Sequence, residues 1–209
     1  MSDIVIVSAA RTPVGSFNGS FTDMSAADLG SIAIKEAINR AKVKTSEVSE
    51  VIMGQVLTAS CGQNPARQAS INAGIPNEIT AYTINQVCGS GLRSIALGWQ
   101  SIMNDESEII VAGGQENMTQ APHCFHLRQT GKIGDAEMID SMIKDGIWDI
   151  FNGYHMGVTA ENVAEKWQIT RDQQDEMALN SQLKAEEAQK NGKFQKEIVS
   201  VPVQLKTGT

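Results

Sequence analysis

The chain has 209 residues, of which 41% are hydrophobic and 20% charged, an ordinary composition for a large globular domain with or without an insertion. Its formal net charge of −7 disfavours a nucleic-acid partner, because binding phosphates calls for a basic face. No apolar run approaches the ~18 residues that a membrane helix needs. The first residues resemble neither a signal peptide nor a transit peptide, so we expect a cytoplasmic protein with no membrane partner.

Helical periodicity and apolar runs alternate along the first half of the chain. Strands are predicted at residues 3–8, 50–57, 80–87 and 108–112. Helices are predicted over 26–42, from Pro65 to Gly74, and directly behind the third strand. Strands without polar alternation that are separated by helices are typical of a parallel sheet covered on both faces. The predicted fold class is therefore α/β.

The helix behind the third strand has a marked apolar stripe. Its members recur at helical spacing: Leu92, Ile95, Ala96, Trp99, Ile102 and Met103.

The character of the sequence changes near residue 117. From there to residue 160 the chain is rich in Gly, Met and His, with no clean periodicity. Thr170 and Gln173 form a capping box that opens a long polar helix ending near residue 190, and a last strand is expected at 197–203. We divide the chain into an α/β domain, residues 1–118, and an excursion that covers the edge of the sheet, residues 119–209.

The three cysteines are scattered and include no CxxC pair, which favours free thiols in a reducing compartment. Cys61 lacks a strand-turn-helix setting. Cys124 stands between His123 and His126, but these crowded groups have no fourth ligand, so we expect no metal site.

Cys88 stands between a strand and an amphipathic helix, followed by Gly-Ser-Gly. The unpaired N–H groups and partial positive charge of the helix N-terminus stabilise a thiolate. The glycines let a substrate carbonyl approach the backbone, and the Cys88 amide can help to bind an oxyanion. Ligands of open α/β sheets bind at this end of the strands. On spacing alone, however, Cys88 fits a buried structural thiol equally well.

Five segments, in this order, resemble the thiolase family: SAARTPVGSFNGSF at 8–21, GQNPARQ at 62–68, NQVCGSGLRSI at 85–95, GGQENM at 113–118 and GYHMGVTAENVA at 153–164. The resemblance runs the whole length of the chain. It implies the N-terminal half of a layered αβαβα fold. It also implies that Cys88 attacks an acyl-CoA and holds the acyl group as a thioester. A second acyl-CoA, deprotonated at its α-carbon, then attacks that thioester.

The segment GIWDIFNGYHMG at 146–157 resembles the thiolase loop that covers the pantetheine arm and the acyl pocket. By that match Ile147, His155 and Met156 line the substrate site. Taken without the family, His155 fits a loop histidine bonded to nearby backbone. The YHMG string looks more like acetoacetyl-CoA thiolases than long-chain enzymes, which implies acetyl-CoA and acetoacetyl-CoA as substrates and no separate cofactor.

The resemblance also bears on assembly. The segment 126–135 resembles one that joins dimers into tetramers, and GQNPARQ resembles dimer-interface sequence. We therefore expect a homo-oligomer, a dimer or tetramer, or a complex with a separate C-terminal half.

Two thiolase motifs are absent from this sequence. In the family, the histidine of Gly-His-Pro activates the nucleophile, and the cysteine of Cys-x-Gly-Gly-Gly acts as acid and base at the α-carbon. We therefore expect exposed apolar surfaces where a second half would pack. A truncated or split acyltransferase remains in competition with a non-catalytic remnant that binds acyl-CoA or a partner. A ketosynthase-like condensing enzyme, which shares the fold and the cysteine but lacks the YHMG loop, is a further alternative.

Overall fold

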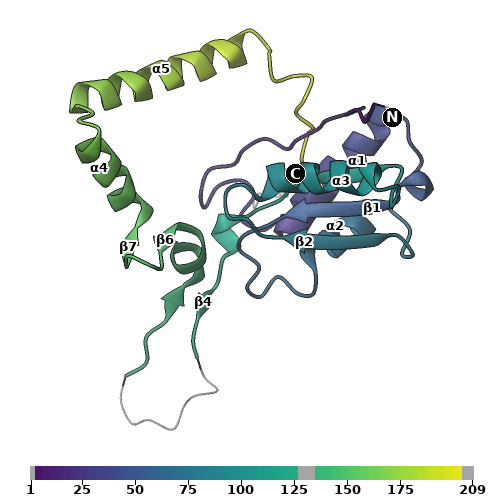
Figure 1. The fold of residues 1–209 in the computed structure, drawn as a ribbon, viewed down its shortest axis with the longest axis horizontal. Coiled ribbons are helices and arrows are strands. Elements are labelled where there is room, and N and C mark those ends of the chain that lie inside the picture. The colour runs from purple at the N-terminus through teal and green to yellow at the C-terminus, as the bar shows by residue number, and fades with distance from the viewer. Residues whose placement is uncertain (1–2, 127–134, 204–209) are drawn as a thin grey trace.

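The structure, a computed structural model, describes residues 3–126 and 135–203. Its centre is a three-stranded parallel sheet in the order β2–β1–β3, with helices on both faces (Figure 1). The strands are β1 Glu50–Gly54, β2 Thr80–Ile84 and β3 Ile110–Gly114. The helices are α1 Ala26–Ala41, α2 Pro65–Asn72 and α3 Ser90–Met103, with short turns at η1 Thr45–Glu47 and η2 Met118–Gln120. The predicted α/β class is confirmed.

Helices α1 and α2 cover one face of the sheet and form the main core with it. Val51 and Met53 of β1 are almost fully buried between Ile34 of α1 and Ala66 and Ala69 of α2. Both helices begin where local sequence signals place them. The capping box of Ser25 and Asp28 opens α1, and Pro65 occupies the first turn of α2.

Helix α3 covers the other face of the sheet with its smallest side chains. Ser90, Ser94 and Gly98 are buried, one turn apart. The Ser94 hydroxyl donates a hydrogen bond to the carbonyl of Gly91 or of Gly113, at 2.7 Å and 2.8 Å respectively. This spacing lets the helix lie close against the strands.

The apolar stripe of α3 consequently does not pack on the strands, and most of its members line a cavity shared with β3 and residues 4–10. Leu92 is 76% exposed and Trp99 51% exposed, with Ile95 and Met103 exposed beside them. The expected exposed apolar surface is therefore present on this helix.

The strand predicted at residues 3–8 is not formed. These residues run extended but join no ladder, and Val5, Ile6 and Val7 are 68%, 77% and 69% exposed. A strand needs a neighbouring edge to pair with, and the nearby edge of β3 is separated from this segment by a cavity that both line. The prediction read the β-branched run correctly as extended but was wrong about its burial and pairing.

The strand predicted at 197–203 is reduced to one parallel bridge between Arg11 and Ile198. Arg11 N–H donates to Glu197 O, and Val199 N–H donates to Arg11 O, each at 2.9 Å. The next donor in this parallel ladder would be Pro13, which has no N–H. The ladder therefore stops after one step, and the prediction was wrong.

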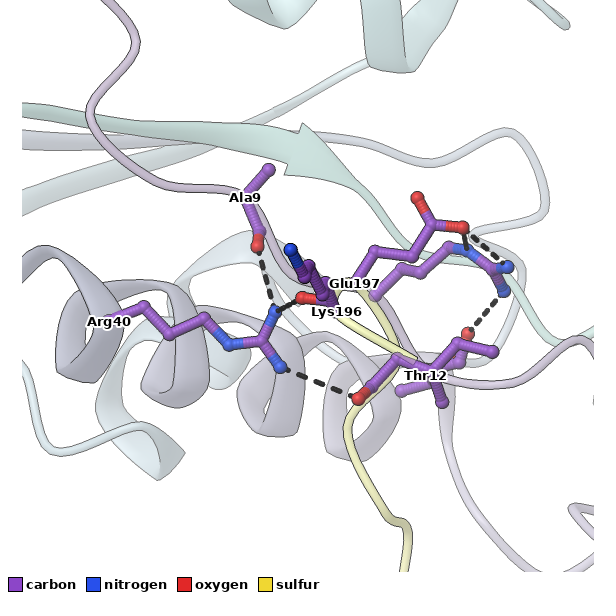
Figure 2. A network of polar contacts seen from close by, with 7 residues as sticks. Ala9, Thr12, Arg40, Lys196 and Glu197 are labelled. Carbon is purple, nitrogen blue, oxygen red and sulfur yellow. Dashed lines mark hydrogen bonds and ion pairs between the residues drawn. The ribbon is translucent and has the colours of Figure 1, made fainter. Parts of the chain in front are cut away.

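Arg40 near the end of α1 holds these two segments together (Figure 2). Its guanidinium donates to the carbonyls of Ala9 at 3.1 Å, Lys196 at 2.6 Å and Ile198 at 3.4 Å. Arg11 pairs with the carboxylate of Glu197 at 2.9 Å. The N-terminal segment is thus held by hydrogen bonds near Ala9 and Arg11, although residues 3–8 pair with no strand.

Residues 123–126 and 135–203 belong to an arm that leaves the sheet and returns to the N-terminal segment near Ile198 (Figure 1). Two short antiparallel ladders begin it: β4 His123–Cys124 with β5 Ile139–Asp140, and β6 Trp148–Asp149 with β7 Tyr154–His155. A wide helical turn, η4 Met142–Ile147, lies between them, and α4 Met156–Lys166 and α5 Arg171–Lys190 follow.

No residue of α4 or α5 is buried. The capping box of Thr170 and Gln173 forms, so the predicted long helix is confirmed. The boundary at residue 118 remains a prediction. Among the described residues, no helix is both long and apolar enough to cross a membrane.

Replacing Arg40 with alanine removes its donors to three backbone carbonyls. We expect the Arg40→Ala variant to lose about 1–2 kcal/mol of unfolding free energy in urea denaturation. Backbone amides near residue 198 should also exchange faster. Arg171→Ala is the control, since its pair with Asp175 lies in solvent and should contribute little. Equal effects from both variants would contradict the anchoring role.

Candidate active site

Cys88 lies in a tight turn between β2 and α3, as the sequence predicts. Side chains within the turn hold its backbone. The Asn85 side-chain oxygen accepts from Val87 N–H at 2.8 Å. The Ser90 hydroxyl accepts from Gln86 N–H at 2.8 Å and donates to the Val87 carbonyl at 2.6 Å. The turn is therefore shaped by its own residues before any substrate arrives.

Val87 adopts a left-handed backbone conformation, with φ of 49°. A β-branched residue in this region is a genuine outlier that costs on the order of 1–3 kcal/mol. The hydrogen bonds of Asn85 and Ser90 offset part of that cost. The sequence pattern did not reveal this strained residue, which directly precedes the candidate nucleophile.

The Cys88 thiol is exposed, two residues before the first residue of α3. Within the described residues, its backbone N–H has no hydrogen-bond acceptor. A substrate carbonyl attacked by the sulfur could therefore accept from this N–H. The exposed thiol does not match the buried structural cysteine of the alternative, and the role of Cys88 as nucleophile stays a prediction.

Glycines bring the start of α3 against the carboxyl ends of the strands. A Cβ at Gly54 of β1 would lie 2.6 Å from the Cβ of Ser90, and one at Gly114 of β3 would lie 3.4 Å from the Cα of Gly91. A larger residue at Gly54 would push the helix away. The position of Cys88 above the sheet thus depends on this close approach.

Glu116 and Asn117, which follow β3, hold neighbouring loops in place through hydrogen bonds to their backbone. Glu116 accepts from the N–H groups of Val56 at 2.8 Å and Leu57 at 3.3 Å. Burial raises the pKa of the Glu116 carboxyl above its usual value, although these two bonds favour the ionised form. Asn117 donates to the carbonyls of Phe21 and Met24. The sequence identifies GGQENM at 113–118 as a thiolase-like motif but does not predict these hydrogen bonds to other loops.

Ile147, His155 and Met156 gather around one small ladder. Trp148 pairs with His155 in β6 and β7, which places Ile147 and Met156 next to each other one step further along. Ile147 is half-buried, whereas His155 and Met156 are exposed. His155 Nδ1 accepts from Gly157 N–H at 3.0 Å, so in the neutral ring the proton is on Nε2. This is the backbone-bonded loop histidine that the residues alone suggested.

Within the described part of the chain, no hydrogen bond joins Cys88 to any residue of that ladder, and Cys88 lines neither the cavity beside Cys61 nor the cavity beside β3. The shared role of the three residues in substrate binding remains a prediction. Most of segment 126–135, predicted to join dimers, lies outside the described residues. In the other predicted interface segment, Arg67 donates to the carbonyls of Asn77 and Ile79 of its own chain.

The other two cysteines have different surroundings. Cys61 is half-buried, and burial raises the pKa of its thiol. Its sulfur lies 3.4 Å from the Leu57 carbonyl. Cys124 is also half-buried, in β4, where the neighbouring His123 faces Asp140 across the ladder at 3.9 Å. Neither cysteine lies directly before the first turn of a helix.

Comparison with known proteins gives a consistent result. The family model described as "Thiolase, N-terminal domain" matches residues 4–209. An "Acetyl-CoA acetyltransferase" of Rhizobium meliloti (strain 1021) is 60% identical over 205 residues, which are 98% of this chain and 52% of that protein. One of Paracoccus denitrificans is 58% identical over 100% of this chain and 53% of its own.

A rat protein, "Acetyl-CoA acetyltransferase, cytosolic", from Rattus norvegicus, is 54% identical over 98% of this chain and 52% of its own. The chain thus spans about half the length of the curated relatives it matches.

The positions of the three thiols predict their reactivity. Cys88 should react with iodoacetamide at neutral pH faster than Cys61 and Cys124, because it is exposed at a helix N-terminus and they are half-buried. Peptide mass mapping over time measures the three rates. Cys88→Ser should remove the fast phase alone. Equal rates at all three sites in folded protein would contradict the assignment.

Proposed function

The chain belongs to the thiolase family, and we propose that it carries the nucleophile of an acetyl-CoA acetyltransferase that forms or cleaves acetoacetyl-CoA. The observation that carries the proposal is the exposed Cys88 thiol, held at a strand-to-helix turn beside its own free N–H. The printed names of the relatives support the substrate class.

The proposed reaction has two halves. The Cys88 thiolate attacks the carbonyl carbon of acetyl-CoA, the carbon–sulfur bond to coenzyme A breaks, and the released thiolate takes up a proton. The Cys88 N–H donates to the oxyanion that forms during this exchange. A second acetyl-CoA then loses an α-proton to a base, and its carbon attacks the acetyl thioester and frees Cys88. Covalent catalysis speeds the reaction because it replaces one difficult acyl transfer with two easier steps.

Both halves of this reaction need bases that a second polypeptide half would supply. The thiolase motifs that carry them, Gly-His-Pro and Cys-x-Gly-Gly-Gly, do not occur in this sequence. Each positioned base typically contributes ~10²–10⁴-fold to the rate. The chain by itself should therefore accept an acetyl group slowly and fail to turn over.

The ladder of Ile147, His155 and Met156 is proposed to cover the pantetheine arm and the acyl group. With Nδ1 accepting from Gly157, the neutral His155 ring has Nε2–H free to donate to a thioester or amide oxygen. Met156 and Ile147 offer the apolar surface of a small acyl pocket. Closure of this ladder over Cys88 would need the second half in place.

We also propose that the protein is cytoplasmic and acts as a homo-oligomer. Two observations support a cytoplasmic location: the three cysteines are free thiols, and the name of the rat relative includes the word "cytosolic". The exposed apolar stripe of α3 supports association in general.

A second candidate is a non-catalytic remnant that binds acyl-CoA or a partner subunit. Two observations favour it: His155 accepts from the backbone N–H of Gly157, and among the described residues no base bonds to Cys88. The ketosynthase-like alternative ranks lower, because the chain carries the YHMG loop that such enzymes lack.

Mass spectrometry after incubation with acetyl-CoA tests the proposal. We expect one acetyl group on Cys88 and none on the Cys88→Ser variant. Thiolysis of acetoacetyl-CoA should be absent with the chain alone and should appear when a separately expressed thiolase C-terminal half is added.

Turnover by the chain alone would show that the missing bases are assigned wrongly. No adduct and no complementation, with both halves folded and associated, would favour the remnant.

A further inference from the structure

The strained residue in the turn before α3 is not held there by packing. Val87 has a φ of 49°, a conformation that β-branched residues rarely adopt. Its side chain is 51% exposed, so burial does not impose this conformation. The cause therefore lies in the hydrogen bonds of the backbone on either side of Val87.

The peptide plane before Val87 is held by Asn85. The Asn85 side-chain oxygen accepts from Val87 N–H at 2.8 Å. Asparagine is short enough to bond to its own backbone two residues further along. The carbonyl in the same plane, that of Gln86, accepts from Gly89 N–H at 3.1 Å. Asn85 directly follows β2, which ends at Ile84, so this acceptor starts from a fixed strand.

The peptide plane after Val87 is held by Ser90. The Val87 carbonyl accepts from the Ser90 hydroxyl at 2.6 Å and from Ser90 N–H at 3.1 Å, and therefore points into the first turn of α3. In a planar trans peptide the N–H of the next residue points the opposite way. The Cys88 N–H is thus directed out of the turn, and no described residue accepts from it.

The two planes meet at Val87, whose φ and ψ set the angle between them. Asn85 on one plane and Ser90 on the other together hold an angle that Val87 does not favour by itself. With only one plane held, Val87 relaxes toward a negative φ. The direction of the Cys88 N–H relative to its sulfur is then no longer fixed.

We propose that Asn85 is a positioning residue for acyl transfer to Cys88. It keeps Val87 in the left-handed conformation and so aims the Cys88 N–H at the oxyanion that forms when the sulfur attacks an acyl carbonyl. The role needs no contact between Asn85 and the substrate. The inference rests on the proposed function only in taking Cys88 as an acyl acceptor, and it applies to any activated acetyl donor.

Two reactions of Cys88 separate the direction of its N–H from the reactivity of its thiolate. Acetylation by p-nitrophenyl acetate forms the carbon–sulfur bond through an oxyanion and releases p-nitrophenolate. Alkylation by iodoacetamide displaces iodide at a saturated carbon and forms no oxyanion. Both reactions need the thiolate, so the ratio of their rates at one pH reports the oxyanion donor. Peptide mass mapping of the 209-residue chain measures both rates at Cys88.

Three single variants test the role of the Asn85 oxygen. Asn85→Leu should lower the acetylation-to-alkylation ratio about tenfold, part of the ~10²–10³-fold loss that removing an oxyanion donor typically causes. Asn85→Asp keeps an acceptor oxygen and should retain the ratio, although its charge slows both reactions by disfavouring the thiolate. Gln86→Leu is the control, because this exposed neighbour makes no side-chain hydrogen bond within the described residues. Its ratio should be unchanged.

A second replacement at Val87 distinguishes positioning from a general loosening of the turn. Glycine adopts a positive φ at little cost, so adding Val87→Gly to Asn85→Leu should recover several-fold of the lost ratio. General loosening predicts a further loss, since glycine adds flexibility. The double-mutant cycle with Val87→Gly alone measures the coupling between the two residues.

Three results would overturn the inference. The first is an Asn85→Leu chain with the ratio of the unaltered chain. The second is a double variant whose ratio falls below that of Asn85→Leu. The third is an unaltered chain whose Cys88 is acetylated no faster than a small thiol that iodoacetamide alkylates at the same rate, since no oxyanion donor would then be in place.

Acetyl-CoA as the donor tests the proposed function separately. A ratio that depends on Asn85 with p-nitrophenyl acetate, together with no acetylation by acetyl-CoA, would support the positioning role and contradict the proposed substrate. The same dependence with both donors would support both.

Discussion

The close packing of α3 on the sheet is the constraint on which the rest of the structure depends. Ser90, Ser94 and Gly98 form the inner face of this helix, and the glycines at the ends of β1 and β3 meet its first turn. Small residues on both sides allow a separation that larger side chains would prevent. The same packing fixes where the preceding turn, with its strained Val87 and exposed Cys88, projects from the sheet.

A helix that packs through its small residues must present its large ones elsewhere. Five members of the α3 stripe line the apolar cavity beside β3, together with residues of the N-terminal segment: Leu92, Ile95, Ala96, Trp99 and Ile102. The proposed chemistry is divided, because the proposed nucleophile and oxyanion donor both belong to Cys88, whereas the sequence lacks the two thiolase motifs that carry the bases.

Features governed by neighbouring residues were predicted from the sequence. The capping boxes at Ser25 and Thr170 and the turn at Cys88 formed where their residues stand. Two predicted strands failed for reasons that their own residues do not show: residues 3–8 lack an adjacent edge, and 197–203 meets Pro13, which cannot donate. Periodicity located the apolar stripe of α3 but could not tell which face meets the sheet. The bracing role of Glu116 depends on loops 60 residues away along the chain, which no local pattern records.

The orientation of α3 can be tested most directly by exchanging the character of its two faces. The thermal midpoint of the 209-residue chain is measured for Ser94→Leu and for Leu92→Ser. Because Ser94 is fully buried and Leu92 is 76% exposed, Ser94→Leu should lower the midpoint strongly or prevent folding. Leu92→Ser should leave the midpoint nearly unchanged. The reverse order, with Leu92→Ser the more damaging, would mean that the apolar stripe faces the sheet and would contradict the placement of Cys88 described above.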